Sequence, residues 1–155
     1  GATGATGATG AAGATGATGA AGGLPAGLYA INSSGLVSPT IAVGSPIPFN
    51  TPVTTFGAGI SQLDVDTFEV TGPGGFSVTF ILSTAALSLL GGAQVQVDGA
   101  PVGATFTLIS AGTPILGQAL FIVGAGAHTV EIVATGAAVT LATGNNASII
   151  IEQVA

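Results

Sequence analysis

The amino-terminal part of the chain repeats glycine at every third position. Glycine occupies positions 1, 4, 7, 10, 13, 16, 19 and 22 without a gap, mostly in Gly-Ala-Thr triplets. A collagen triple helix requires this period because only glycine fits at the crowded axis where three chains meet. A flexible Gly/Ala linker, the alternative, has no reason to keep a strict period of three. The sequence therefore predicts a collagen-like stalk over residues 1–23, and with it an assembly of three chains.

This stalk contains no proline. Collagen triplets normally carry proline, whose ring presets the extended backbone conformation of each chain. Residues 1–23 have only glycine, alanine and threonine. We therefore expect a stalk that is a weak triple helix by itself and depends on the remainder of the chain.

The composition excludes several classes of function. The chain has no lysine, arginine or cysteine, and its charged residues make up 4% of 155 residues, with a net charge of −6. Without cationic side chains there is no surface to neutralise phosphates, so we expect no nucleic-acid partner. Without cysteine there is no disulfide, no thiolate nucleophile and no cysteine-ligated metal.

The mean hydropathy of +0.81 is typical of a membrane protein, but the pattern is not. A spanning helix needs about 18 or more consecutive apolar residues. Here glycine, proline and polar residues break every apolar run within about ten residues. We expect no membrane insertion, and no secretory signal peptide because a basic leader is missing. Since the chain begins inside a repeat, we interpret it as part of a longer protein.

Residues 24–155 show the alternation of β-strands and no helical period. The expected strands cover 28–32, 66–70, 75–82, 94–98, 129–132 and 148–152, with further short ones between them. Asp98-Gly99 is a typical two-residue hairpin turn, from which the chain returns through Val102. Nine or ten short strands in such a length predict an all-β sandwich or jelly roll.

Three expected strands are apolar on both faces, at residues 85–90, 116–123 and 149–151. In a two-layer sandwich only one face of each sheet meets the core, so another subunit must cover the second face. The collagen-like stalk sets the number of subunits at three, so the two parts of the sequence predict the same homotrimer. The candidate interface residues are Leu116, Leu120, Phe121, Ile149, Ile150 and Ile151.

Few side chains could support catalysis or metal binding. His128, the one histidine, is interpreted as a structural or edge residue in preference to a member of a Ser-His-Asp site, because no nucleophile-elbow context is present. Asp64 and Asp66 could bind calcium, but an exposed turn is the preferred interpretation. Asn32 and Asn146 stand in glycosylation sequons. We predict no catalytic residue, no metal site and no cofactor.

Two glycine-containing segments could be mistaken for phosphate-binding loops. They are Gly57-Ala58-Gly59 and Gly124-Ala125-Gly126. Neither opens a helix or carries a basic residue, so both are interpreted as ordinary loops.

Several strings resemble a known family. The segment 23–30 follows the Gly-x-Thr repeat, and Pro48-Phe49-Asn50, residues 60–68 and the ending at 147–155 come after it. Together they resemble the collagen-like glycoproteins that form the hair-like nap on the exosporium of Bacillus spores. Less specifically, residues 67–80 resemble the globular head of complement component q, one of the tumour-necrosis-factor-like jelly rolls.

The resemblance implies a homotrimeric jelly-roll head, residues 24–155, at the outer tip of a collagen-like filament on the spore surface. The implied partners are the chain itself, other spore-surface proteins, and ligands on host or environmental surfaces. In such proteins, threonines of the repeat carry O-linked sugars. The corresponding residues here are Thr3, Thr6, Thr9, Thr15 and Thr18. The usual Gly-Pro-Thr triplet of the family is Gly-Ala-Thr in this chain.

The resulting hypothesis is a structural filament protein, not an enzyme, whose head brings three stalks into register. Two alternatives stay open. One is a ligand-recognition or adhesion head, and the other is the tip fibre of a phage or spore appendage.

Overall fold

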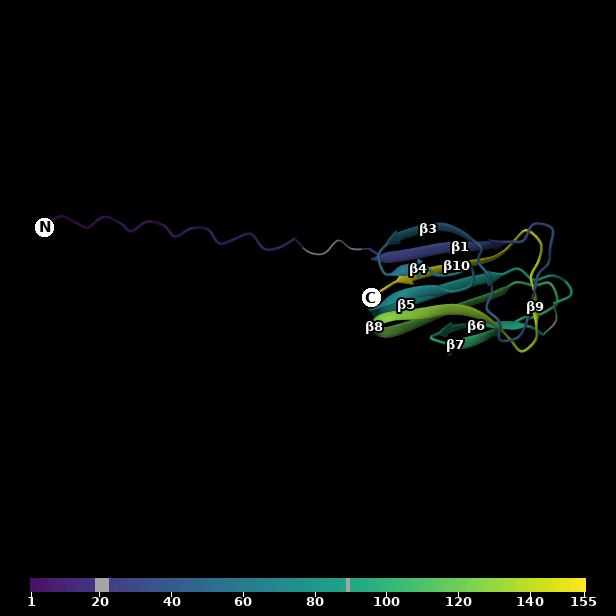
Figure 1. The fold of residues 1–155 in the computed structure, drawn as a ribbon. Helices are drawn as coiled ribbons and strands as arrows, with labels where there is room; N and C mark the ends of the chain where they lie inside the picture. The colour runs from purple at the N-terminus through teal and green to yellow at the C-terminus, as the bar shows by residue number, and fades with distance from the viewer. Residues whose placement is uncertain (19–22, 89) are drawn as a thin grey trace.

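The computed structural model describes residues 1–18, 23–88 and 90–155. Residues 1–18 form an extended segment without helix or strand, and every residue of it is exposed (Figure 1). Gly19 and Gly22 of the glycine period lie outside the described residues. The first strand begins at Ala26, close to the predicted boundary between stalk and head.

The head is built from ten strands, and no helix occurs in its described residues. Within that same part of the chain, no helix could cross a membrane. The strands are β1 (Ala26–Ser33), β2 (Thr40–Ile41), β3 (Thr51–Gly57), β4 (Ile60–Gln62), β5 (Phe68–Leu82), β6 (Gly92–Val97), β7 (Ala100–Thr107), β8 (Ile115–Thr135), β9 (Val139–Thr140) and β10 (Asn145–Gln153).

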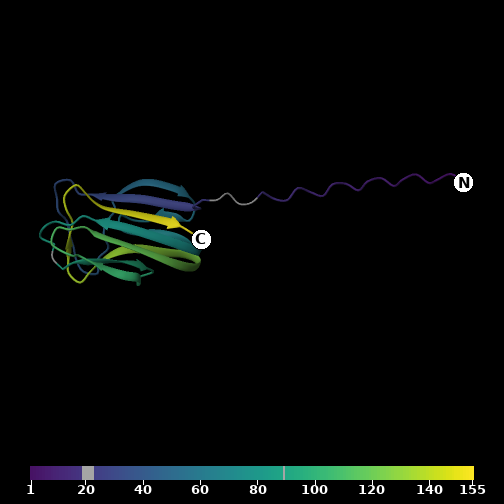
Figure 2. The ribbon, with the colours of Figure 1, turned by 180° about the vertical axis from the view of Figure 1, so that it is seen from behind.

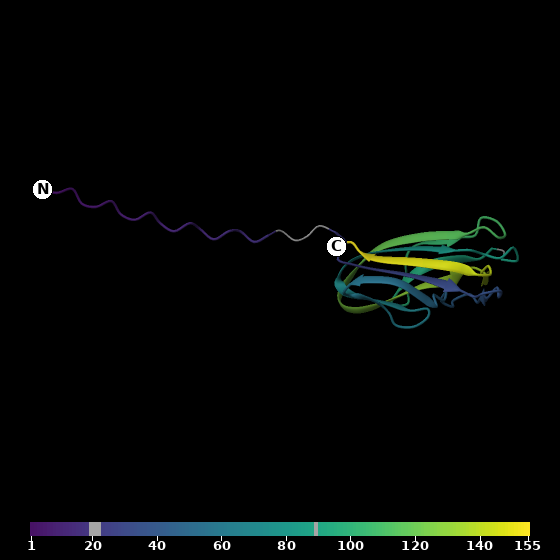
Figure 3. The same ribbon diagram turned by 90° about the horizontal axis from the view of Figure 1, so that it is seen from above.

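Eight of these strands form one antiparallel sheet in the order β3-β1-β10-β5-β8-β6-β7, with β4 added beside β5. This sheet folds over on itself. Two strands, β8 and β6, separate β5 from β7 in the order, yet the ring centroids of Phe80 on β5 and Phe106 on β7 are 6.0 Å apart. Such contact is possible only when the two ends of the sheet face each other. Figures 1 and 2 show the resulting two layers from opposite sides, and Figure 3 shows them from above.

The fold-over occurs where β5 and β8 bend together. Gly72 pairs with Gly126 and Gly74 with Val123, so two residues of β8 lie opposite Pro73 alone. This is a β-bulge, which bends a strand and shifts its side-chain alternation by one. In β8 the odd-numbered residues 115–123 are buried before the bulge, and Val130, Ile132 and Ala134 after it. Both strands therefore keep apolar side chains on the inside as they pass between layers.

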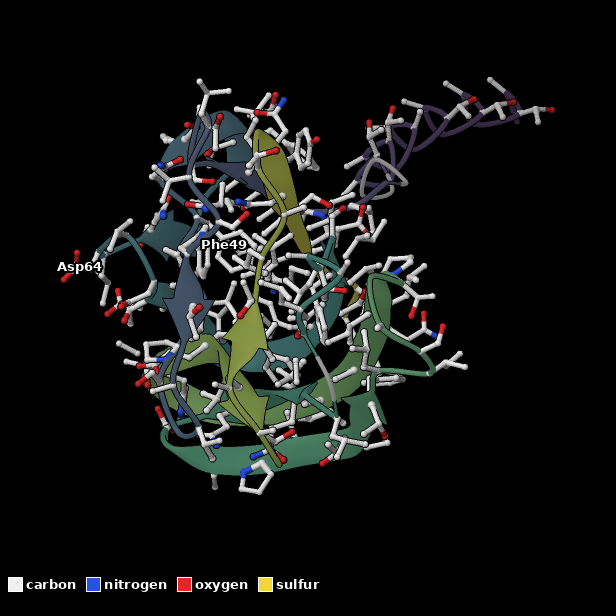
Figure 4. All side chains as sticks on the ribbon, turned by 90° about the vertical axis from the view of Figure 1, so that its right-hand side faces the viewer. Phe49 and Asp64 are labelled. Atoms are coloured by element: carbon white, nitrogen blue, oxygen red, sulfur yellow. The ribbon has the colours of Figure 1, made fainter. Side chains whose placement is uncertain are left out.

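The first layer contains β3, β1, β10, residues 76–82 of β5 and residues 115–123 of β8. The second contains β4, β6, β7 and the remaining halves of β5 and β8. Phenylalanines fill the space between them. Phe49 packs edge-on against Phe68 at 5.6 Å, and Figure 4 shows Phe49 in the interior of the head. The jelly-roll sandwich expected from the sequence is thus the observed architecture.

Most predicted strands are present. The segments 28–32, 75–82, 94–98, 129–132 and 148–152 lie within β1, β5, β6, β8 and β10, or within one residue of them. The hairpin at Asp98-Gly99 is confirmed, with φ of 51° and 78° as a tight turn of this kind requires. β5 and β8, however, have 15 and 21 residues and are not short.

Two predictions were wrong. Residues 85–90 are not a strand where the structure describes them, because the Ser88 amide donates to the Ala85 carbonyl at 2.9 Å and closes a turn. The apolar residues of this segment do not form the face of a strand. Leu87 and Leu90 lie on a loop and are exposed to solvent. The segment Gly124–Gly126 is not a loop between strands but the bulge inside β8.

Gly117 on β8 marks the closest approach of the two layers. A Cβ atom there would lie 2.3 Å from the Phe80 ring and 2.6 Å from the Phe106 ring. We expect Gly117→Ala to lower the free energy of unfolding by about 1–3 kcal/mol through overpacking. Urea denaturation measures this change. Gly124→Ala is the control, because a Cβ there meets nothing within 4 Å. Equal stability of the two variants would contradict the packing described.

Candidate functional site

One face of the first layer carries apolar side chains that a single chain leaves exposed. We call it the outer face, and define it as the side of β1, β10, residues 76–82 of β5 and residues 115–123 of β8 that points away from the core. Strand register places its residues in rows. One row runs Tyr29, Ile150, Thr79 and Gln118. The next contains Ile81 opposite Leu116, and Leu120 and Ile122 follow further along β8. Aliphatic and aromatic side chains thus occupy neighbouring positions across four strands.

These side chains are exposed to a degree unusual for their type. Leu120 is 73% and Ile122 86% exposed, and Leu116, Ile81, Ile150 and Tyr29 are all above one third. Contiguous apolar surface of this kind marks an interaction site. Fully burying a leucine or isoleucine contributes about 1.5–3 kcal/mol. The row that contains Leu120 also contains Ser77 and Glu152, and Glu152 carries the one charge among the described residues of the outer face.

A hollow of about 310 Å³ lies at one end of the outer face. Its walls include Tyr29, Phe56, Ile150 and Glu152. The Phe56 ring lies over Gly27, where a Cβ atom would be only 2.5 Å from it. The outer face therefore has an aromatic depression near β3 and β1 and protruding leucine and isoleucine side chains on β8.

Strand alternation divides the six predicted interface residues into two groups. Leu116, Leu120 and Ile150 lie on the outer face and are exposed. Phe121, Ile149 and Ile151 point inward and are buried in the core of their own chain. Runs such as Ile149–Ile151 place neighbouring residues on opposite sides of a strand, so not all of a run can meet a partner. Of the six predicted interface residues, only Leu116, Leu120 and Ile150 are therefore available to contact another chain.

His128 lies on β8 next to the bulge, and both ring nitrogens have partners. Nδ1 is 2.7 Å from an Asp98 carboxylate oxygen, and Nε2 is 3.1 Å from the Gly124 carbonyl. Asp98 also accepts a hydrogen bond from the Thr129 amide at 2.9 Å. With Nε2 on a carbonyl oxygen, the ring has no nitrogen left to activate a serine. The arrangement instead ties the β6–β7 turn to the bend of β8.

The contact between His128 and Asp98 shifts the pKa of both side chains. The hydrogen bond that the His128 ring donates to the Asp98 carboxylate raises the pKa of His128 above its ordinary 6.5, and the bond to the Gly124 carbonyl adds to the effect. The hydrogen bond from His128 lowers the pKa of Asp98, with the Thr129 amide adding to it. The ion pair therefore exists between the lowered pKa of Asp98 and the raised pKa of His128.

The remaining polar candidates are explained locally. Asp64 accepts a hydrogen bond from the Val65 amide at 2.6 Å, and Figure 4 shows it pointing outward from its loop. Asp66 accepts one from the Thr67 hydroxyl. In the part of the chain that the structure describes, no three histidine, cysteine or acidic side chains come together to bind a metal.

The two sequon asparagines are buried rather than available to a glycan. The Asn32 amide donates to the Asn146 side-chain oxygen at 2.8 Å, and Asn146 donates in turn to the Ser34 hydroxyl and the Ala142 carbonyl. This hydrogen-bonded pair joins β1 to β10. Periodicity alone could not find it, because nothing in the sequence says that residues 114 positions apart are in contact.

Comparison with known proteins identifies the head. Residues 28–155 match the family model described as the BclA C-terminal domain. The chain belongs to this family. BclA-type heads are the carboxy-terminal domains of collagen-like proteins of the Bacillus exosporium, which confirms the resemblance noted in the sequence. Comparison with curated protein sequences gives no significant match.

Solved structures share the fold of this BclA-type head at low sequence identity. The globular domain of zebrafish complement 1qA is 16% identical with a TM-score of 0.57, covering 84% of this chain and 96% of that one. Murine APRIL at pH 8.5 has the same identity and TM-score, covering 82% and 98%. The PRD1 vertex protein P5 is 14% identical with a TM-score of 0.52, covering 86% and 100%.

The His128–Asp98 pair predicts a defined titration. We expect the ring protons of His128 to titrate above pH 6.5 by NMR, and Asp98→Asn to return the midpoint toward 6.5, because the stabilising carboxylate is gone. A raised pKa means that the interaction stabilises the fold below 6.5 and is lost as pH rises through the raised value. An unchanged midpoint in Asp98→Asn would show that the ring does not contact this carboxylate in solution.

Proposed function

We propose that this BclA-type head is a trimerisation module. Three copies associate through their outer faces and hold three Gly-x-y segments in register, so that the head forms the distal tip of a structural filament on the spore surface. The observation that carries the proposal is the exposed apolar outer face, whose area one chain cannot bury. The role is structural rather than enzymatic.

The glycine period supports the same stoichiometry. A Cβ atom added at Gly1, Gly4, Gly7, Gly10, Gly13 or Gly16 would meet nothing within 4 Å. A single chain therefore gives no steric reason for glycine at these positions, whereas the axis of a triple helix does. The outer face favours self-association, and the glycine period sets the number of chains at three.

Effective concentration explains how the head would act on the stalk. Bringing three separate chains into register is entropically unfavourable, and a proline-free stalk is poorly prepared for it. Three stalks joined to one trimeric head meet at about millimolar local concentration, as for short linkers. Triple-helix formation then proceeds outward from the head without further loss of translational freedom.

Glycosylation of the stalk is part of the proposal. Thr3, Thr6, Thr9, Thr15 and Thr18 are all exposed on the extended segment, as an O-linked sugar requires. Self-association, other spore-surface proteins and host or environmental ligands are the proposed partners.

Two alternative functions share this geometry. An adhesion head would use its surface to bind a specific ligand, and a glycan array on the isolated head would reveal it. A phage or appendage tip fibre is favoured by the likeness to the vertex protein P5. Immunolabelling of intact spores would separate a spore filament from a phage fibre.

Placing a charge on the outer face tests the interface. We expect wild-type protein to have the mass of three chains by light scattering, and Leu120→Asp to have the mass of one, because each trimer would bury three like charges at several kcal/mol each. Ile109→Asp is the control, since Ile109 is even more exposed than Leu120 but lies on a loop away from the outer face. A wild-type monomer at micromolar concentration, or an intact Leu120→Asp trimer, would contradict the proposal.

Dependence of the stalk on the head gives a second test. When a free peptide of residues 1–22 forms a triple helix, ordering the backbone costs about 1–2 kcal/mol of conformational entropy per residue. The interchain hydrogen bonds return only about one modest net contribution per triplet. We expect circular dichroism to show disorder in the peptide and a polyproline-like signal in the full chain. A stable triple helix from the peptide alone would show that the head is not needed to form it.

A further inference from the structure

The end of the head opposite the stalk is formed by four segments that we name the tip loops. They are residues 34–39, 83–91 without residue 89, 108–114, and 136–144 including β9. Antiparallel topology places them together, because β1, β5 and β7 end where β6, β8 and β10 begin. Figures 1 and 3 show these connections at the end away from both termini.

Large aliphatic side chains project from the tip loops. Leu36 is 96% and Ile109 92% exposed, and Leu87 and Leu90 are above 80%. Leu87 and Leu90 share one loop, and Leu36 and Ile109 come from two others, so three of the four loops contribute apolar side chains. Single exposed leucines are ordinary on protein surfaces, but several at one end of a domain form an interaction surface.

The tip loops carry no charged residue. All six acidic residues are elsewhere, at positions 64, 66, 69, 98, 131 and 152. The chain also has no lysine or arginine with which to bind an anionic group. A partner that fits this end must therefore be uncharged overall and apolar where it makes contact.

Hydrogen bonds between the loops give the tip a defined shape. Segment 136–144 lies in the middle: the Ser34 amide donates to the Gly144 carbonyl at 3.0 Å, and the Ala85 amide to the Thr140 carbonyl at 2.9 Å. The Thr84 hydroxyl donates to the Thr113 carbonyl at 2.6 Å, which ties in the next loop. The apolar side chains therefore project from a hydrogen-bonded base.

A hollow of about 330 Å³ lies between two of the loops. Leu90, Leu108, Ile109, Ser110 and Ala111 line it. Leu90 has a φ of 60°, a conformation that disfavours a leucine and is found where the surrounding structure imposes it. That backbone holds the Leu90 side chain at the solvent-facing edge of the hollow.

From this end of the molecule we infer a lipid-binding surface: without any spanning segment, the tip loops bury Leu36, Leu87, Leu90 and Ile109 in the surface of an uncharged lipid layer, and the hollow accepts the end of an acyl chain. Such binding scales with buried apolar area and, in this chain, has no contribution from cationic residues. The inference needs only the tip of one chain and is independent of trimer formation.

A lipid surface fits better than a protein partner. Leucine is under-represented among the energetically dominant residues of protein interfaces, whereas it is typical of surfaces that are buried in the lipid interface. The exposed large side chains of the tip loops are mostly leucine, and the tip loops contain no tryptophan, tyrosine or arginine. Acyl chains impose no polar pattern that a partner surface must match, which suits a surface without charged groups.

Flotation with phosphatidylcholine vesicles tests the inference on the full chain. We expect the wild type to float with the vesicles, equally at low and high salt. Adding phosphatidylserine should leave binding equal or weaker, because the chain is anionic. No flotation with phosphatidylcholine, or binding only to vesicles with phosphatidylserine, would overturn the inference.

A triple variant locates the binding surface. Leu36→Ser, Leu90→Ser and Ile109→Ser together should weaken vesicle binding at least tenfold, with unchanged mass and unchanged thermal melting. Leu63→Ser is the control, because Leu63 is an exposed leucine outside the tip loops and its replacement should leave binding intact. Wild-type binding by a folded triple variant would overturn the inference. The inference would also be overturned if the wild type doubled its mass in the absence of vesicles and the triple variant did not. That result would indicate tip-to-tip association of the protein.

Discussion

The antiparallel pairing of β5 with β8 holds the two layers of the head together, and the other features depend on it. Both strands bend at the bulge opposite Pro73, and the extra residue in β8 restores the inward alternation on the far side. Because side chains in a strand alternate between faces, filling the core from both layers also determines what points outward. On the first layer the outward positions of β8 are Leu116, Gln118, Leu120 and Ile122, and all are exposed. The apolar outer face is therefore a direct consequence of register.

The lack of cationic side chains shapes every interaction that the chain can make. His128 with Asp98 is the one ion pair that the described residues form, and it lies at a turn rather than on the outer face. Self-association must then rely on apolar contact and shape, and Glu152 must stay near solvent or a polar neighbour. The same lack of charge at the opposite end leaves the tip loops suited to an uncharged layer. One composition thus serves two different surfaces.

The sequence was sufficient to predict the strands in which apolar and polar residues alternate clearly. Residues 76–82 of β5 and 93–97 of β6 have apolar residues at every second position, and Asp98-Gly99 is an unambiguous turn. The sequence did not predict strands in which this alternation is absent. Every residue of β3 is exposed, so no buried face marks that strand, and β2 and β9 are too short, at two residues each, to show a pattern. Both faces of residues 149–151 are apolar, so the sequence could not say which side meets the core. The Asn32–Asn146 contact depends on tertiary structure, and only the folded head brings these amides together.

Single-cysteine labelling tests the central claim, burial of the outer face by other copies, most directly. The chain has no cysteine, so Leu120→Cys and Leu36→Cys each introduce one unique thiol. In one chain both positions are exposed. We predict that a maleimide reacts with the thiol at position 36 at the rate seen in denaturant, and with the thiol at position 120 at least tenfold more slowly until the assembly is dissociated. Equal rates at both positions in the native protein, at concentrations where it should be assembled, would contradict the account.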